Sequence, residues 1–151
     1  MVPAPRELLL GSEYSRFGRH LTLLGAVALA VATFVAYAVD LFAVSGGVLV
    51  LPGDATLVGL VVATGVGYRS GGLVSAWLAL VAPYLGFHAD WAFLGLSGRG
   101  LAAELAFLFD PVSLAVFGTA AVVLGTLAYG AGALVRRSLQ FVRRSALPGR
   151  S

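Results

Sequence analysis

A long run of apolar residues, from Leu21 to Val44, constrains this chain more than any other feature of its sequence. Polar side chains interrupt the run only at Thr22, Thr33, Tyr37 and Asp40. About 20 helical residues, each rising about 1.5 Å, cross the roughly 30 Å hydrocarbon core of a bilayer. The run also exceeds the roughly 7–15 apolar residues of a cleaved signal peptide. It therefore predicts an uncleaved transmembrane helix.

Two further apolar segments are bounded by turn signals. The second segment, 55–68, follows Pro52-Gly53-Asp54, in which the Pro-Gly pair marks a turn and Asp54 is placed to cap the helix. The stretch Gly46–Leu51 before that turn is expected to dip into the membrane interface or to form a re-entrant segment. The third segment, 73–89, contains Pro83, which transmembrane helices tolerate where neighbouring groups satisfy the backbone.

The last apolar segment, 111–135, opens with Asp110-Pro111, which is typical of an N-cap followed by proline at the first helical position. It is expected to end at Arg136, and a cytoplasmic basic tail follows over residues 136–151. Between the third and fourth segments, the apolar run Leu101–Phe109 is expected to lie flat on the membrane surface, with Glu104 facing water.

The predicted fold is all-α: one integral membrane bundle of four transmembrane helices, with a short interfacial helix in the last outer loop. The helices are expected at about 21–44, 55–68, 73–89 and 111–135. Composition supports this fold, because 59% of the residues are hydrophobic and only 11% are charged. Soluble domains carry about a quarter charged residues, and a soluble chain of this size could not bury so much apolar surface.

The distribution of arginine predicts the orientation in the membrane. With the N-terminus in the cytoplasm, nine of the ten arginines lie on the cytoplasmic side and Arg99 alone lies outside. Cytoplasmic loops of membrane proteins are enriched in basic residues. We therefore expect a multi-pass protein of the plasma membrane with both termini in the cytoplasm. The acidic residues on the outer side would be Asp40, Asp54, Asp90, Glu104 and Asp110.

Stripes of small residues predict where the helices meet, because membrane helices associate where small side chains permit close approach. Such stripes occur at helical spacing in three of the segments. They comprise Gly25, Ala28, Ala32 and Ala36 in the first, Ser75, Ala79, Ala82 and Gly86 in the third, and Gly118, Ala121, Gly125, Ala128 and Gly132 in the fourth.

Three ionisable residues form a candidate cation or proton site. Asp40 and Asp90 follow the small-residue stripes of the first and third segments, and His88 precedes Asp90 closely. Two carboxylates and an imidazole, with Tyr37 nearby, could bind a cation or relay a proton. The alternative is that all three lie fully hydrated at the outer interface, where an acidic group costs little free energy.

The basic residues after the last segment are candidates for contact with lipid headgroups. Juxtamembrane arginines attract anionic lipids by about 1 kcal/mol each near the surface. They also serve as ordinary topology determinants, which is the alternative interpretation. Trp77 and Tyr84 are interpreted as aromatic anchors at the membrane interfaces. The candidate headgroup contacts are Arg136, Arg137, Arg143 and Arg144.

Enzyme signatures are missing from the sequence. It has no HExxH metal pair, no phosphate-binding P-loop and no GxSxG nucleophile elbow. Cysteine is absent, which excludes disulfides, thiolate chemistry and cysteine-ligated metals. We expect no catalytic residue, no cofactor and no metal site. Membrane topology explains the net charge of +3, so no nucleic-acid partner is expected.

Three stretches between residues 68 and 137 resemble uncharacterised small multi-pass membrane proteins of halophilic archaea. They are Tyr68-Arg69-Ser70-Gly71-Gly72, the segment from Ala89 to Arg99, and Leu108-Phe109-Asp110-Pro111. The resemblance implies a membrane location and a halophilic host, and it brings no activity with it.

The sequence favours a non-enzymatic membrane protein that serves as an accessory or structural subunit. The lipid bilayer is its expected surrounding. A second copy or another membrane protein is an expected partner, because four short helices offer limited internal contact. The alternative function is a small cation- or proton-coupled transporter or channel component that uses Asp40, His88 and Asp90.

Overall fold

A computed structural model describes residues 5–10, 16–43, 51–95 and 98–145, and it excludes the side chains of residues 5–7, 16–19, 144 and 145. The described chain is all-helical. Most of Gly46–Leu51 lies outside it, so the re-entrant segment expected there stays a prediction. The elements are α1 (Pro5–Leu10), α2 (Arg16–Ala38), α3 (Gly53–Tyr68), α4 (Leu73–Asp90), the π-helical turn η1 (Trp91–Gly95), α5 (Leu101–Leu108) and α6 (Pro111–Ser145).

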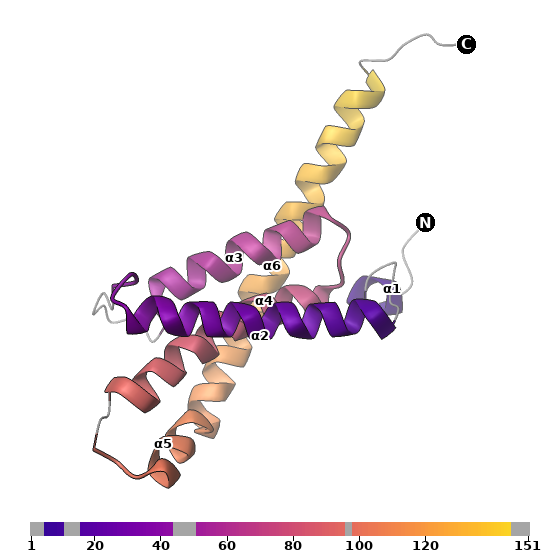
Figure 1. Cartoon of the computed structure of the whole chain (residues 1–151). Helices are drawn as coiled ribbons and strands as arrows, with labels where there is room; N and C mark the ends of the chain where they lie inside the picture. The colour runs from indigo at the N-terminus through magenta and orange to yellow at the C-terminus, as the bar shows by residue number, and fades with distance from the viewer. Residues whose placement is uncertain (1–4, 11–15, 44–50, 96–97, 146–151) are drawn as a thin grey trace.

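The four longest helices form a bundle with α4 at its centre. Helix α4 contacts α2, α3 and α6, and α3 also packs along α6. In Figure 1, α6 runs obliquely from α5 up to the C-terminus and extends well beyond the other helices. The short helix α1 packs on α4, whereas η1 and α5 follow the far end of α4. The core is therefore built around α4, whose Leu80 and Tyr84 are fully buried.

Three helical stretches are long and apolar enough to cross a membrane. They lie at His20–Ala38, at Leu73–Gly95 and within Leu101–Arg143. Helix α3 is also apolar but has only 16 residues, which corresponds to about 24 Å. Each of the four apolar segments expected from the sequence is thus helical, and the length and hydropathy of three of them indicate a membrane protein.

Glycine permits two close helix crossings. At Gly86 of α4, an added Cβ would collide with the carbonyl oxygen of Ala30 and would lie 3.0 Å from the backbone nitrogen of Phe34. At Gly132 of α6, an added Cβ would collide with the carbonyl oxygen of Thr64. Such close approach increases dispersion contact between helices, which matters in lipid, where no hydrophobic effect drives helices together.

The small-residue stripe of α4, and that of α6 apart from Gly118, are used as expected, whereas that of α2 is mostly exposed. In α6, Ala121, Gly125, Ala128 and Gly132 are buried. In α2, Gly25, Ala28 and Ala32 are exposed, and Ala36 alone of its stripe is buried. Helix α2 instead turns Thr33 and Tyr37 toward α4, because Tyr37 buries its ring between the aromatic rings of Phe42 and Phe87.

The observed helix ends differ from the expected ones at two places. Helix α2 stops at Ala38, because Asp40 adopts a left-handed conformation with φ of 56° and the N–H of Leu41 donates back to Ala36. Aspartate is among the few residues that visit this region readily. Helix α6 continues to Ser145 rather than ending at Arg136. No glycine or proline interrupts the sequence between Gly132 and Pro148, so nothing stops the helix earlier.

Of the two expected N-caps, one is wrong and one is confirmed. Asp54 lies inside the first turn of α3, and Pro52 takes the cap position without a side-chain hydrogen bond. Asp54 still interacts favourably with the positive end of the helix dipole. Asp110 does cap α6, since its carboxylate accepts a hydrogen bond of 2.8 Å from the N–H of Ser113. This hydrogen bond lowers the pKa of Asp110 below its ordinary value.

The crossing at Gly86 predicts a sharp sensitivity to side-chain size. Gly86→Leu should destabilise the bundle by about 1–3 kcal/mol, the usual cost of overpacking, because α2 must move away from α4. Gly118→Leu is the control, since an added Cβ there meets nothing within 4 Å. Thermal unfolding in detergent measures both variants, and equal midpoints would contradict the crossing.

Candidate functional site

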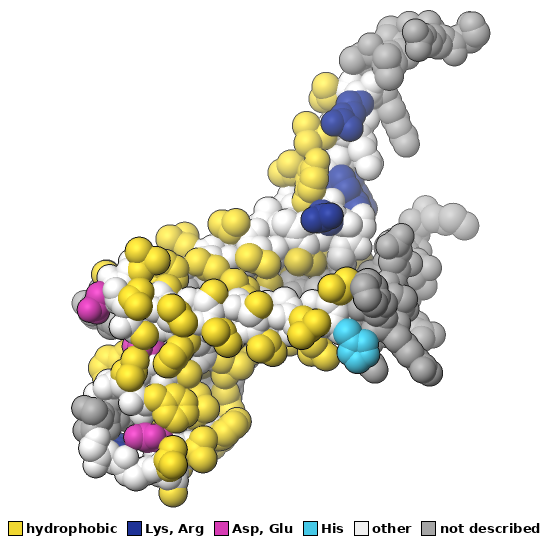
Figure 2. Space-filling model, viewed as in Figure 1, with side chains coloured by type: hydrophobic (Ala, Val, Ile, Leu, Met, Phe, Trp, Pro, Cys, Tyr) yellow, Lys and Arg dark blue, Asp and Glu magenta, His cyan; other side chains and the backbone are white. Residues whose placement is uncertain are grey.

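Charged residues divide between the two ends of the molecule. Acidic side chains gather at the end that holds α5 and the α2–α3 connection, together with Arg99, whereas the other described arginines lie on the turn after α3 and on the protruding part of α6 (Figure 2). The described acids of the first end are Asp40, Asp54, Asp90, Glu104 and Asp110. The described arginines of the second end are Arg69, Arg136, Arg137 and Arg143. The two ends are therefore the places to look for ionic chemistry.

His88 is the buried ionisable group of the acidic end, with 5% of its surface exposed. Its Nε2 lies 2.9 Å from the carbonyl oxygen of Phe107. A carbonyl only accepts hydrogen bonds, so Nε2 carries the proton. The imidazole also stacks on the ring of Phe107, with centroids 4.6 Å apart, and meets the ring of Phe117 edge-on at 5.4 Å. His88 thereby fastens α5 to α4.

The three residues of the predicted cation or proton site do not converge on one point. Positions 88 and 90 differ by about 200° around a helix, so their side chains leave α4 on opposite faces. His88 points to α5 and lies within electrostatic range of Asp110. Asp90 instead lies within electrostatic range of Asp40 at the end of α2. The structure thus leaves the two carboxylates within electrostatic range of each other and places the imidazole on another face of α4.

Tyr37 lies beside the carboxylate pair and carries an unusual hydroxyl. The side chain is 5% exposed, and its hydroxyl has no well-formed hydrogen bond within the described part of the chain. It lies near the backbone of Ala55 in the first turn of α3 and within electrostatic range of Asp54 and Asp90. The backbone of Ala55 offers this buried hydroxyl only a weak hydrogen bond, so the position favours an additional partner such as water.

Tyr84 is fully buried, which overturns its interpretation as an interfacial anchor. Its hydroxyl shares a hydrogen bond of 3.2 Å with Thr56, whose hydroxyl in turn lies 2.8 Å from the carbonyl oxygen of Pro52. The Tyr84 ring stacks on Phe117 at 5.4 Å. Sequence pattern gave no sign of this pair, because Thr56 and Tyr84 lie 28 residues apart on different helices. Trp77 is also bound to a neighbouring helix, because its indole N–H donates a hydrogen bond of 3.1 Å to Thr126 on α6.

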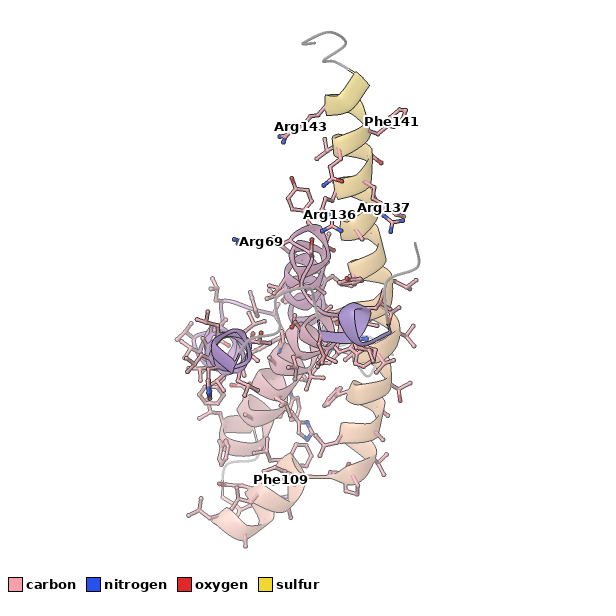
Figure 3. The ribbon with its side chains drawn as sticks, turned by 90° about the vertical axis from the view of Figure 1, so that its right-hand side faces the viewer. Arg69, Phe109, Arg136, Arg137, Phe141 and Arg143 are labelled. Atoms are coloured by element: carbon pink, nitrogen blue, oxygen red, sulfur yellow. The ribbon has the colours of Figure 1, made fainter. Side chains whose placement is uncertain are left out.

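The basic end holds the predicted headgroup contacts on a helix rather than on an extended tail. Arg136 is half-buried where α6 leaves the bundle, and its Nε makes no hydrogen bond to any described residue. Arg143 lies two turns further along the same side, and Arg137 points to the other side (Figure 3). The side chain of Arg144 lies outside the described residues.

The protruding part of α6 is amphipathic. At about 100° per residue, Val135, Leu139 and Val142 share one face, and all three are exposed. By the same period, Arg136 and Arg143 flank this apolar face, and Arg137 and Gln140 lie opposite to it. A helix with one basic and one apolar side is typical of a segment that lies against a membrane surface.

No group of three or more His, Asp or Glu side chains in the described chain is arranged to hold a metal ion. Comparisons of the chain with protein-family models, with curated proteins and with solved structures find no significant match. The resemblance to small membrane proteins of halophilic archaea therefore stays a prediction. The chemistry of the site rests on its own geometry.

The hydrogen bond of His88 predicts a selective effect on α5. His88→Phe should lower the unfolding free energy by about 1–3 kcal/mol, because the carbonyl of Phe107 loses its buried donor. His88→Gln, which keeps a donor, should lose less. Thermal unfolding in detergent measures stability, and protease cleavage in 96–101 reports release of α5. A fully stable His88→Phe with an intact loop would show that the hydrogen bond is unimportant.

Proposed function

We propose that this chain is a four-span protein of the plasma membrane, with both termini in the cytoplasm, that serves as a non-enzymatic subunit of a larger membrane assembly. In this arrangement α2, α3, α4 and α6 cross the bilayer, α5 lies on the outer surface, and the arginine-bearing end faces the cytoplasm. The separation of acidic and basic residues between the two ends supports this orientation.

The single observation that favours a subunit role is the one-sided packing of α6. Helix α6 uses one face for α3 and α4, and its other face stays apolar and exposed. An apolar groove of about 780 Å³ follows its first half, lined by Leu51, Val112, Val116 and Val123 among others. A transmembrane helix of a partner protein fits such a groove, and the small residues Ala115 and Ala120 permit close approach.

The interior polar groups also support a static role. Thr33 and Thr64 donate to carbonyls of their own helices, and Trp77 bonds Thr126 across one helix contact. His88 is committed to the backbone of α5. Each of these bonds joins one donor to one neighbouring acceptor. The Asp, Glu, His and Arg side chains of the described chain lie toward the two ends rather than along a path between them. A transporter uses ionisable groups within the membrane to carry charge.

The topology predicts a specific labelling pattern, because the chain has no native cysteine. We expect Ala102→Cys, on the exposed surface of α5, to react with a membrane-impermeant maleimide in intact cells. Leu8→Cys and Ser138→Cys should react only after lysis, since both ends lie in the cytoplasm. Labelling of Leu8→Cys and Ser138→Cys from opposite sides would mean an odd number of spans, and α3 would then not cross.

The subunit role predicts co-purification of a stoichiometric membrane partner from the native host in mild detergent. Ala115→Trp fills the α6 groove and should release that partner. Leu127→Trp adds the same bulk elsewhere on α6, where Leu127 is 66% exposed, and should retain it. Mass measurement of the purified complex and identification of its components test both variants.

A second candidate function is cation- or proton-coupled transport, favoured by the electrostatic proximity of Asp40 and Asp90 and by the buried Tyr37 hydroxyl, which lacks a well-formed hydrogen bond to the described residues. It predicts that the wild-type chain purifies as a homo-oligomer and supports ion flux in liposomes. Asp40→Asn together with Asp90→Asn should then abolish flux without loss of expression. That outcome would overturn the subunit role, whereas absence of flux would remove the transporter.

A further inference from the structure

Helices α2 and α3 both lie on α4 and leave an apolar groove between them. The groove has a volume of about 510 Å³. Gly25 and Ala28 of α2 form one wall, Val62 and Val66 of α3 form the other, and Ala79 of α4 lies at the floor. An added Cβ at Gly25 would meet nothing within 4 Å, so this part of the groove is open space.

The lining becomes polar toward the arginine-bearing end. Thr22 and Ser75 are the hydroxyl-bearing residues of the lining, and both lie near the start of their helices at that end. Arg69 follows directly on α3, one turn beyond the lining residue Val66. Figure 3 looks onto this end of the bundle and shows Arg69 projecting away from α6, on the side where α2 lies. An arginine therefore lies one turn beyond the polar end of the groove lining, on the side of α2.

The turn after α3 fixes this position. The N–H of Arg69 donates to Gly65 at 3.0 Å, and the N–H of Gly71 donates to Val66 at 2.9 Å. Ser70 between them adopts a left-handed conformation with φ of 64°. The side chain of Arg69 is exposed, and the described carboxylates lie at the opposite end of the molecule. Among the described side chains, Arg69 therefore has no carboxylate partner, and its exposed guanidinium is accessible to an external anion.

We propose that this groove binds a phospholipid, with one acyl chain between α2 and α3 and its phosphate against Arg69. The inference rests on the proposed membrane orientation, which sets Arg69 at the level of the cytoplasmic headgroups. An apolar groove facing lipid excludes water and is filled by hydrocarbon. The planar guanidinium donates two parallel hydrogen bonds to phosphate oxygens, which favours a phosphate at the mouth. A helix from a second copy would fill the same walls without requiring Arg69.

The test uses the full chain purified in mild detergent, with bound lipid counted by native mass spectrometry. We expect the wild-type chain to retain one phospholipid and, after delipidation, to rebind phosphatidylglycerol. Gly25→Leu fills the groove and should abolish retention. Gly130→Leu is the matched control, because an added Cβ there also meets nothing within 4 Å but the residue lies on α6 outside the groove.

The headgroup contact is tested by a pair of charge-matched variants. Arg69→Gln should weaken rebinding by about tenfold, as expected for loss of charge-assisted hydrogen bonds. Arg99→Gln removes the same charge at the acidic end of the molecule, outside the groove, and should leave rebinding unchanged. Equal retention by Gly25→Leu and wild type, or equal rebinding by Arg69→Gln and wild type, would overturn the proposal.

Two further outcomes separate this proposal from its rivals. If Gly25→Leu converts a dimer to a monomer while bound lipid is unchanged, the groove belongs to a contact between copies and the lipid site is wrong. If the wild-type chain fractionates with membranes and labels as a four-span protein but binds no lipid, only the lipid site fails. Failure of the labelling pattern would instead remove the orientation on which the site rests.

Discussion

Close approach of helix backbones is the constraint on which the rest of the bundle depends. In lipid, apolar side chains gain little by leaving their surroundings, so association relies on dispersion contact and on hydrogen bonds. Gly86 lets α4 meet the backbone of α2, and Gly132 lets α6 meet that of α3. With these two crossings in place, α4 becomes the shared neighbour of the other three long helices. The aromatic stack of Tyr84 on Phe117 and the bond from His88 to Phe107 then extend the packing toward α5.

Hydropathy and turn signals predicted the helices well, because they depend on local properties. The apolar segments, the cap at Asp110 and the small-residue face of α6 follow from residue type and helical period. The end of α2 was missed, because a left-handed Asp40 ends the helix where hydropathy does not change. Long-range pairings such as Thr56 with Tyr84 were missed too, since no local pattern records which helices become neighbours.

The candidate site illustrates the same limit. Asp40, His88 and Asp90 look like one group along the sequence, and the period of α4 separates His88 from Asp90. What remains at the acidic end is two carboxylates within electrostatic range of each other, with the buried Tyr37 hydroxyl in range of Asp90. The sequence identifies Arg69 only as part of the turn after the second apolar segment. Its position near the groove between α2 and α3 depends on how these two helices diverge across α4, which no local pattern records.

In the proposed four-span arrangement, the shortness of α3 has a mechanical consequence for the surrounding bilayer. Its 16 residues reach about 24 Å, some 6 Å less than a typical hydrocarbon core. Helix α6 has ample length, so the mismatch is confined to one flank of the bundle. Lipids along that flank must shorten or tilt, at a cost of fractions of a kcal/mol per ångström. A four-span chain of this shape would therefore deform the membrane asymmetrically, and neighbours with equally short spans would be drawn to the α3 flank.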